Sequence, residues 1–230
     1  MTGRTIDRST AVVGGNGPFR PLLVGIKEFN ELPQGLYGSG RASALAEVDR
    51  RYGNNALIVA DLSNDPSYAE TLLTTFGRRV IGLHITRLGD GMTVERRPVG
   101  LGNMLVYTIG RSQLLQLLLA ELHSGQVRFV DGPESRRAYG QLEALETELR
   151  DSGIVYKCPA GQHDDLGISC AMLVWAAVHP HLNRWVELGL APRPPAPHSP
   201  TLWVGSIYVT TVSKCLDCIN DSFSAAGHST

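Results

Sequence analysis

The chain has 230 residues, of which 43% are hydrophobic and 19% are charged, a composition typical of one globular domain with extensions. The formal net charge of -1 excludes the strongly basic composition of a dedicated nucleic-acid coat protein. No apolar run reaches the length of a membrane span and no signal-type apolar core follows Met1, so we expect a cytoplasmic protein without a membrane partner.

In chain order, apolar periodicity and turn-forming residues predict strands that alternate with helices. Residues 14–17 are rich in glycine and separate two β-type runs, which predicts a hairpin, whereas the continuous apolar run 56–60 is typical of a strand buried on both faces. The expected strands are 10–13, 21–27, 56–60, 80–85, 126–130 and 154–157, with a loop or loose hairpin over 86–104. The expected helices are 41–52, one beginning at 63–66, one from a Ser112 cap to His123, 135–151 and 164–178.

This order of elements predicts an α/β fold with a mixed sheet and helices on both faces. The character of the sequence changes after residue 183, where residues 191–200 are rich in proline and are expected to be extended. Beyond them, the segment 203–212 is the one β-type run. We therefore divide the chain into a domain over 1–183, a linker over 184–200 and a C-terminal extension of unknown structure over 201–230.

The basic residues are almost all arginines, and many of these occur in pairs. The pairs are residues 50 and 51, 78 and 79, 96 and 97, and 136 and 137. Because arginine binds phosphate in a bidentate fork, the pairs are candidates for a local track along a phosphate backbone. Each pair alone fits a solvated helix end or turn equally well, and an arginine-rich coding bias would also produce them.

Four cysteines, at positions 158, 170, 215 and 218, are too few and too scattered for a disulfide scaffold, so we expect reduced thiols. Cys215 and Cys218 have the spacing of a metal or redox pair. A zinc site needs a second pair of cysteines or histidines, and His228 is isolated. The sequence therefore does not assign zinc to this segment.

Acidic residues at the ends of two predicted elements are the candidates for chemistry. Asp61 ends a buried strand, where the loops of an open α/β sheet form a crevice, although it fits a helix cap or a turn as well. Asp164 and Asp165 open an apolar helix; one of them can cap it, whereas the other would face a packed interior unless a cation or a cleft receives it. His163 is a candidate for a further ligand or a proton-transfer group, or is structural.

Carboxylates from separate elements are the ligands that a hard divalent cation needs, with positions left for water and phosphate. Two such ions about 3.5 to 4 Å apart activate a water and stabilise the leaving oxygen in phosphodiester cleavage. The acids at the ends of the strand and the helix therefore point to a metal-dependent phosphodiesterase as one interpretation.

Several segments occur together in an order known from a protein family. They are the buried strand ending in Asp61, residues 109–115 before a helix that ends near Gly125, residues 128–130, residues 141–149, and the segment Gly161-Gln-His-Asp-Asp-Leu-Gly-Ile-Ser-Cys-Ala-Met-Leu173. Over about residues 5–180 the chain resembles the C-terminal nuclease domain of phage terminase large subunits. The helix start His163-Asp164-Asp165-Leu166 is the most specific element of this resemblance.

The resemblance implies a ribonuclease H-like mixed sheet flanked by helices. It implies an endonuclease, dependent on Mg²⁺ or Mn²⁺ with two bound ions, that cuts concatemeric double-stranded DNA during genome packaging. By position, Asp61 resembles the central-strand carboxylate, and Asp164 or Asp165 the helix carboxylate. The implied setting is the bacterial cytoplasm with a phage or prophage gene, and the implied partners are a terminase ATPase or small subunit and the portal.

The chain departs from the family's pattern at three places. The first catalytic Asp of the family sits on an initial strand before a second acid; Asp7 matches that second acid, so we expect part of the first strand to be lacking. Asp7 is a candidate replacement metal ligand and fits a turn about equally well. The loop after Asp61 has Leu62-Ser-Asn-Asp65 instead of the family's Gly-x-Gly. No Gly-x-x-x-x-Gly-Lys-Ser/Thr loop occurs, so this chain does not contain the ATPase motor.

These departures keep a second hypothesis open. The chain is then a catalytically defective prophage remnant, or a DNA-binding or assembly module that retains the fold. A resolvase-like nuclease on the same fold is a third, weaker hypothesis.

Overall fold

The computed structural model describes residues 8–17, 20–29, 37–51, 54, 56–63, 68–87, 91–150, 153–179, 182 and 206–213. The strands are β1 (Arg8–Gly17), β2 (Arg20–Phe29), β3 (Leu57–Asp61), β4 (Val80–Thr86), β5 (Thr93–Val99), β6 (Gly102–Gly110), β7 (Val127–Phe129), β8 (Glu146–Arg150), β9 (Gly153–Lys157) and β10 (Ser206–Ser213). The helices are α1 (Tyr37–Arg51), α2 (Tyr68–Phe76), the short 3-10 helix η1 (Gly77–Arg79), α3 (Arg111–His123), α4 (Pro133–Glu143) and α5 (Asp165–Val178).

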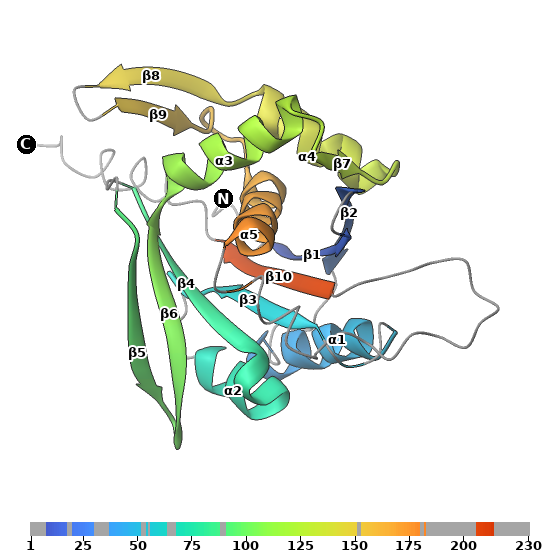
Figure 1. Cartoon of the computed structure of the whole chain (residues 1–230), viewed down its shortest axis with the longest axis vertical. Helices are drawn as coiled ribbons and strands as arrows, with labels where there is room; N and C mark the ends of the chain where they lie inside the picture. Colours follow the sequence, from blue (N-terminus) through green and yellow to red (C-terminus); the bar gives the residue numbers. More distant parts are fainter. Residues whose placement is uncertain are drawn as a thin grey trace, which may run out of the picture.

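Eight strands form one mixed sheet in the order β5-β6-β4-β3-β10-β1-β2-β7, and β8 and β9 form a separate two-stranded sheet (Figure 1). Strands β3, β4 and β6 are parallel neighbours, whereas β1 and β2 form an antiparallel hairpin. Strand β10 lies between these two parts, antiparallel to β1 and parallel to β3. The strand nearest the end of the sequence therefore joins the N-terminal hairpin to the parallel strands.

The composition of β3 explains why helices cover both faces of the sheet. All five of its residues are buried. Leu57 and Val59 belong to a core cluster that includes side chains of α3 and α5, whereas Ile58 and Ala60 belong to a second cluster with side chains of α1 and α2. Because alternate residues of a strand point to opposite faces, the continuous apolar run packs against helices on each side (Figure 1).

Helix α5 lies in the interior, against the sheet and α3. All of its residues except Val178 are buried, which accords with its almost uninterrupted apolar sequence. Three aromatic rings hold its C-terminal end: the ring centroid of Tyr107 on β6 lies 5.2 Å from that of Trp175 and 5.3 Å from that of His179. This packing anchors the C-terminal end of α5. The position of its acidic N-terminal end depends on the contacts that the N-terminal residues make.

The predicted α/β fold with a mixed sheet is confirmed, as are the hairpin, the buried strand 56–60 and the strand 80–85. Residues 86–104 contain most of the β5–β6 hairpin, the second of the two expectations for this segment. Residues 206–213 of the expected C-terminal extension are a strand of the main sheet. Residues 184–200 lie outside the described part of the chain.

Two local predictions are wrong. The helix expected over 135–151 ends at Glu143, and residues 146–150 form β8, because β9 offers this segment an antiparallel partner that a sequence window cannot reveal. Ser112 does not cap α3, whose N-cap residue is Gly110. The Ser112 hydroxyl instead accepts a hydrogen bond from the backbone N–H of Tyr156 at 3.4 Å, which ties the start of α3 to β9.

Two findings bear on the expected environment. In the described ranges, no helix combines the length and the apolar character needed to cross a membrane. Cys158 and Cys170 are buried free thiols, and burial raises the pKa of the Cys170 thiol, which keeps it protonated. Cys215 and Cys218 lie outside the described residues.

The place of β10 gives a first prediction. Ending the chain after residue 200 removes the strand that pairs with both β1 and β3, so the two parts of the sheet lose their hydrogen-bonded connection. We expect this truncation to abolish cooperative thermal unfolding, measured by far-UV circular dichroism. A chain that ends after residue 213 keeps β10 and should melt as the full chain does. Equal melting of both truncations would contradict the structural role of β10.

Candidate functional site

Asp61 is the last residue of β3, and only 6% of its surface is exposed. Ser63 donates two hydrogen bonds to its Oδ1 atom, from the backbone N–H at 2.9 Å and from the hydroxyl at 2.5 Å. The same hydroxyl accepts a hydrogen bond from the backbone N–H of Ile85 at 2.7 Å, near the end of β4. Asp61 therefore shapes the loop that follows β3, and its carboxylate is held in place at the end of the strand.

The charges around Asp61 bring two acids of the predicted site together. Burial raises the pKa of Asp61 above its ordinary value of 3.8; the hydrogen bonds from Ser63 and the charge of His84 lower it, and the negative charge of Asp165 raises it further. Asp165, the first residue of α5, is 2% exposed. The end of β3 and the start of α5 thus place two buried carboxylates within electrostatic reach of each other.

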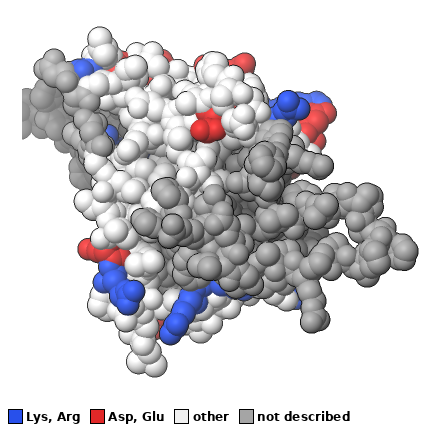
Figure 2. All heavy atoms as spheres, viewed as in Figure 1, with Lys and Arg blue, Asp and Glu red and all other residues white. Residues whose placement is uncertain are grey.

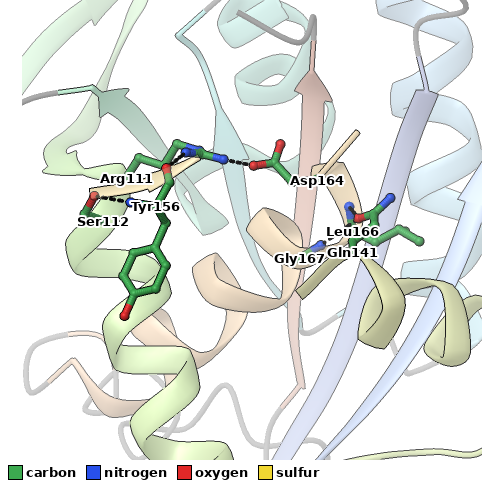
Figure 3. A network of polar contacts seen from close by, with 7 residues as sticks. All are labelled: Arg111, Ser112, Gln141, Tyr156, Asp164, Leu166 and Gly167. Carbon is green, nitrogen blue, oxygen red and sulfur yellow. Dashed lines mark hydrogen bonds and ion pairs between the residues drawn. The ribbon is translucent and has the colours of Figure 1, made fainter. Parts of the chain in front are cut away.

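Asp164 has a different environment from Asp165. Arg111, the first residue of α3, forms an ion pair with the Asp164 carboxylate and donates a second hydrogen bond to the backbone carbonyl of Tyr156 on β9 (Figure 3). The side chains of Arg111 and Asp164 are 19% and 10% exposed. Because a guanidinium neutralises Asp164, this acid is a positioning residue, and Asp165 is the helix acid that adds negative charge next to Asp61.

Neither acid caps α5 with its side chain. Gln141 of α4 takes this role instead: its Oε1 atom accepts hydrogen bonds from the backbone N–H groups of Leu166 at 2.9 Å and Gly167 at 3.2 Å (Figure 3). The first N–H groups of a helix have no partner within the helix, so a side chain from another element satisfies them here. Capping therefore does not account for the pair of acids.

The remaining predicted site residues lie elsewhere or outside the description. His163 is half-buried, and the histidine whose charge acts on Asp61 is His84 on β4. Asp7 lies outside the described residues. Within the described ranges, no three or more His, Cys, Asp or Glu side chains are grouped so as to hold a metal ion. The structure thus brings together Asp61 and Asp165, and it adds His84, Arg111 and Gln141 to the site.

His84 could have been recognised from the sequence, although we did not predict it as a site residue. It is a polar residue near the end of an otherwise apolar strand, and β4 is the parallel neighbour of β3, with Asp61 paired to Leu83. Polar groups at the ends of adjacent parallel strands meet at one edge of a sheet. Arg111 and Gln141 had no comparable signal, because their partners lie 53 and 25 residues away.

Among the described residues, the arginine pairs are interspersed with acidic side chains. In each of the four pairs at least one arginine contacts an acid: Arg50 with Glu47, Arg79 with Asp49, Arg97 with Glu95 and Arg136 with Asp131. On the face shown in Figure 2, basic and acidic side chains lie beside one another. The Arg79–Asp49 pair is largely buried and holds the end of α1 against the start of β3, where Arg79 also donates to the carbonyl of Ala56. These contacts favour the interpretation of the pairs as structural.

No family model, curated protein or solved structure matched this chain in the three comparisons with known proteins.

The raised pKa of Asp61 predicts how stability depends on pH. A carboxyl whose folded pKa lies above its unfolded value contributes stability that is fully present below about pH 3.8 and is lost as the pH rises through the folded pKa. Without divalent metal, Asp61→Asn should therefore raise the melting temperature at neutral pH, and this gain should vanish toward pH 3.8. Asp131→Asn, at an exposed acid, is the control with little effect at any pH. A destabilised Asp61→Asn chain at pH 7 in EDTA would contradict the burial argument.

The Arg111–Asp164 pair gives a prediction for stability. Arg111→Met keeps most of the side-chain length but leaves the Asp164 carboxylate without its cation, which should lower the free energy of unfolding by about 3 kcal/mol. Arg136→Met removes an exposed ion pair with Asp131 and should cost less than about 1 kcal/mol. Urea unfolding of the two variants measures both values, and equal losses would show that the buried pair has no special role.

Proposed function

We propose that this chain is a divalent-metal-dependent DNA endonuclease of the phage terminase type, without the ATPase motor. The observation that carries the proposal is the pair of buried carboxylates, Asp61 and Asp165, that separate elements bring to one end of the sheet. Two buried like charges are unfavourable unless a cation accompanies them. Carboxylate oxygens are the ligands that Mg²⁺ and Mn²⁺ prefer, so the donor set fits such an ion.

We further infer that the sheet is of the ribonuclease H-like kind. Such a sheet joins an antiparallel hairpin to parallel strands through a shared strand, and β10 has this relation to its neighbours β1 and β3. The strand that we expected at the beginning of the chain thus has a counterpart from the other end of the sequence. Its residues Ser206–Ser213 include no acid, so it does not supply the first catalytic Asp of the family.

The residues of the chain have separate roles in this proposal. A divalent ion held by Asp61 and Asp165 would supply activation of water and stabilisation of the leaving oxygen. Ser63 fixes the Asp61 carboxylate through its two hydrogen bonds to Oδ1. Arg111 fixes the start of α5 by binding Asp164. His84, whose charge acts on Asp61, is the candidate for proton transfer, the role that the sequence suggested for His163.

A second candidate function is a DNA-binding or assembly module that has the fold but no nuclease activity. It is favoured by the composition of the site, because the described residues offer two adjacent carboxylates and no group of three metal ligands. The third acid near the site, Asp164, forms an ion pair with Arg111. In either function, the partners we propose are double-stranded DNA and a separate terminase ATPase or small subunit, with the portal.

Plasmid nicking in the presence of Mn²⁺ tests the proposal. We expect the unmodified chain to convert supercoiled plasmid to nicked and linear forms, and Asp61→Asn and Asp165→Asn to slow this by about 100-fold or more. Asp164→Asn should have a smaller effect, because that acid positions the helix. Asp131→Asn, at an exposed acid, is the matched control and should cut at the unmodified rate.

Metal binding is measured in parallel as a shift in melting temperature, since an ion that binds only the folded chain stabilises it. Mn²⁺ should raise the melting temperature of the unmodified chain more than that of Asp61→Asn. Absence of both cleavage and a Mn²⁺-dependent shift in the unmodified chain would exclude the nuclease and leave the DNA-binding or assembly module.

A further inference from the structure

A cavity of about 270 Å³ opens beside the start of α3 and the β8–β9 hairpin. Four of its described lining residues are cations, Arg87, Arg111, Arg150 and Lys157, and no acid is among the described residues that line it. The cations come from different parts of the chain: the end of β4, the first residue of α3 and the two strands of the hairpin. A chain with a net charge of -1 thus gathers four positive side chains around one hollow.

Ion pairs hold three of these cations, Arg111, Arg150 and Lys157, in place. Arg150 and Lys157 share one carboxylate, Glu148, so this group of three keeps one positive charge. The hydrogen bonds and charges of Arg150 and Lys157 lower the pKa of Glu148 to about 2, so the Glu148 carboxyl is fully ionised at neutral pH. Arg111 also donates to the carbonyl of Tyr156, which orients its guanidinium at the wall of the cavity.

Two further features suit an anion with several oxygens. The hydroxyl of Ser112 lines the cavity in the first turn of α3, a helix of 13 residues whose N-terminal end carries a partial positive charge. Guanidinium groups donate paired N–H groups in a geometry that matches a phosphate. Arginines, a lysine and a serine around one cavity are therefore the chemistry of a phosphate site.

We propose that this cavity binds a phosphate group of a nucleic-acid strand and so positions that strand at the Asp61–Asp165 site. Arg111 is the physical connection, because it lines the cavity and also binds Asp164, the residue next to Asp165 (Figure 3). This inference rests on the proposed nuclease function and adds to it a binding site for a phosphate other than the one that is cut. Asp61 and Asp165 are not among the residues that line the cavity.

Fluorescence anisotropy with a labelled DNA duplex of about 20 base pairs tests the site, with EDTA present so that no cleavage occurs. Arg87→Gln, Arg150→Gln and Lys157→Gln should each weaken binding about 5-fold and reduce the slope of log K against log salt by about 1. Arg136→Gln is the matched control, because Arg136 also pairs with an acid but lies outside the cavity, and it should bind as the unmodified chain does. Melting temperatures verify that each variant is folded.

The outcomes separate the sources of the anion. Unchanged DNA affinity in all three variants, or an equal loss in Arg136→Gln, overturns the inference. Inorganic phosphate, tested by thermal shift, is the second arm: if the variants lose stabilisation by phosphate but keep their DNA affinity, the cavity is a small-anion site and the nucleic-acid assignment is wrong.

The outcomes also separate this inference from the proposed function. If the unmodified chain does not cut DNA but the variants bind DNA more weakly than it does, the nuclease proposal is wrong and DNA binding by the cavity is supported. If the variants cut DNA and bind it as the unmodified chain does, the phosphate-binding role of the cavity is wrong and the nuclease proposal stands.

Discussion

The ion pair between Arg111 and Asp164 is the contact on which the arrangement of the candidate site depends, because it connects three elements at one point. Arg111 begins α3, its second hydrogen bond reaches Tyr156 on β9, and Asp164 immediately precedes α5. The other end of α5 is fixed by packing of aromatic rings against β6. A helix held at both ends has little freedom to slide, so its first residue, Asp165, stays next to the end of β3. The backbone N–H groups of this helix start are satisfied by Gln141, which leaves the acids free of a capping role.

The site has an electrostatic cost for the fold. Burial raises the pKa of Asp61, and the negative charge of Asp165 raises it further, so ionisation of Asp61 lowers the stability of the folded chain as the pH rises. Buried carboxylates that serve only the fold are usually paired with a cation, as Asp49 is with Arg79 at the start of β3. Asp49 is thus paired with a guanidinium, whereas Asp61 accepts hydrogen bonds from Ser63. Perturbed acids in such a position are typical of functional sites.

Local patterns predicted much of the fold and about half of the candidate site. The run 56–60 identified β3 because a strand covered on both faces has no polar alternation, and Asp61 was recognisable as the residue that ends it. The division between α4 and β8 was not predictable, because residues 146–150 become a strand only through pairing with β9. The place of β10 depends on pairing with β3 across about 150 residues of sequence, a non-local contact that no window of sequence contains. For the same reason Arg111 and Gln141, which act on α5 from distant elements, were not found.

Arg111 lies between the acidic residues of the candidate site and the cations that line the cavity, because it contacts Asp164 and also lines the cavity. In the proposed nuclease, the two acids that hold the metal also repel a nucleic-acid backbone, so a chain of nearly neutral net charge needs local cations to bring the polyanion to them. Under that proposal, cations lying directly against Asp61 and Asp165 would compete with the metal ion for the two carboxylates. Arg111 forms its ion pair with Asp164, and it also lines the cavity with Arg150 and Lys157. Asp164 thus has a physical reason to be present at the start of α5, because it binds Arg111 and so connects this helix start to α3 and β9.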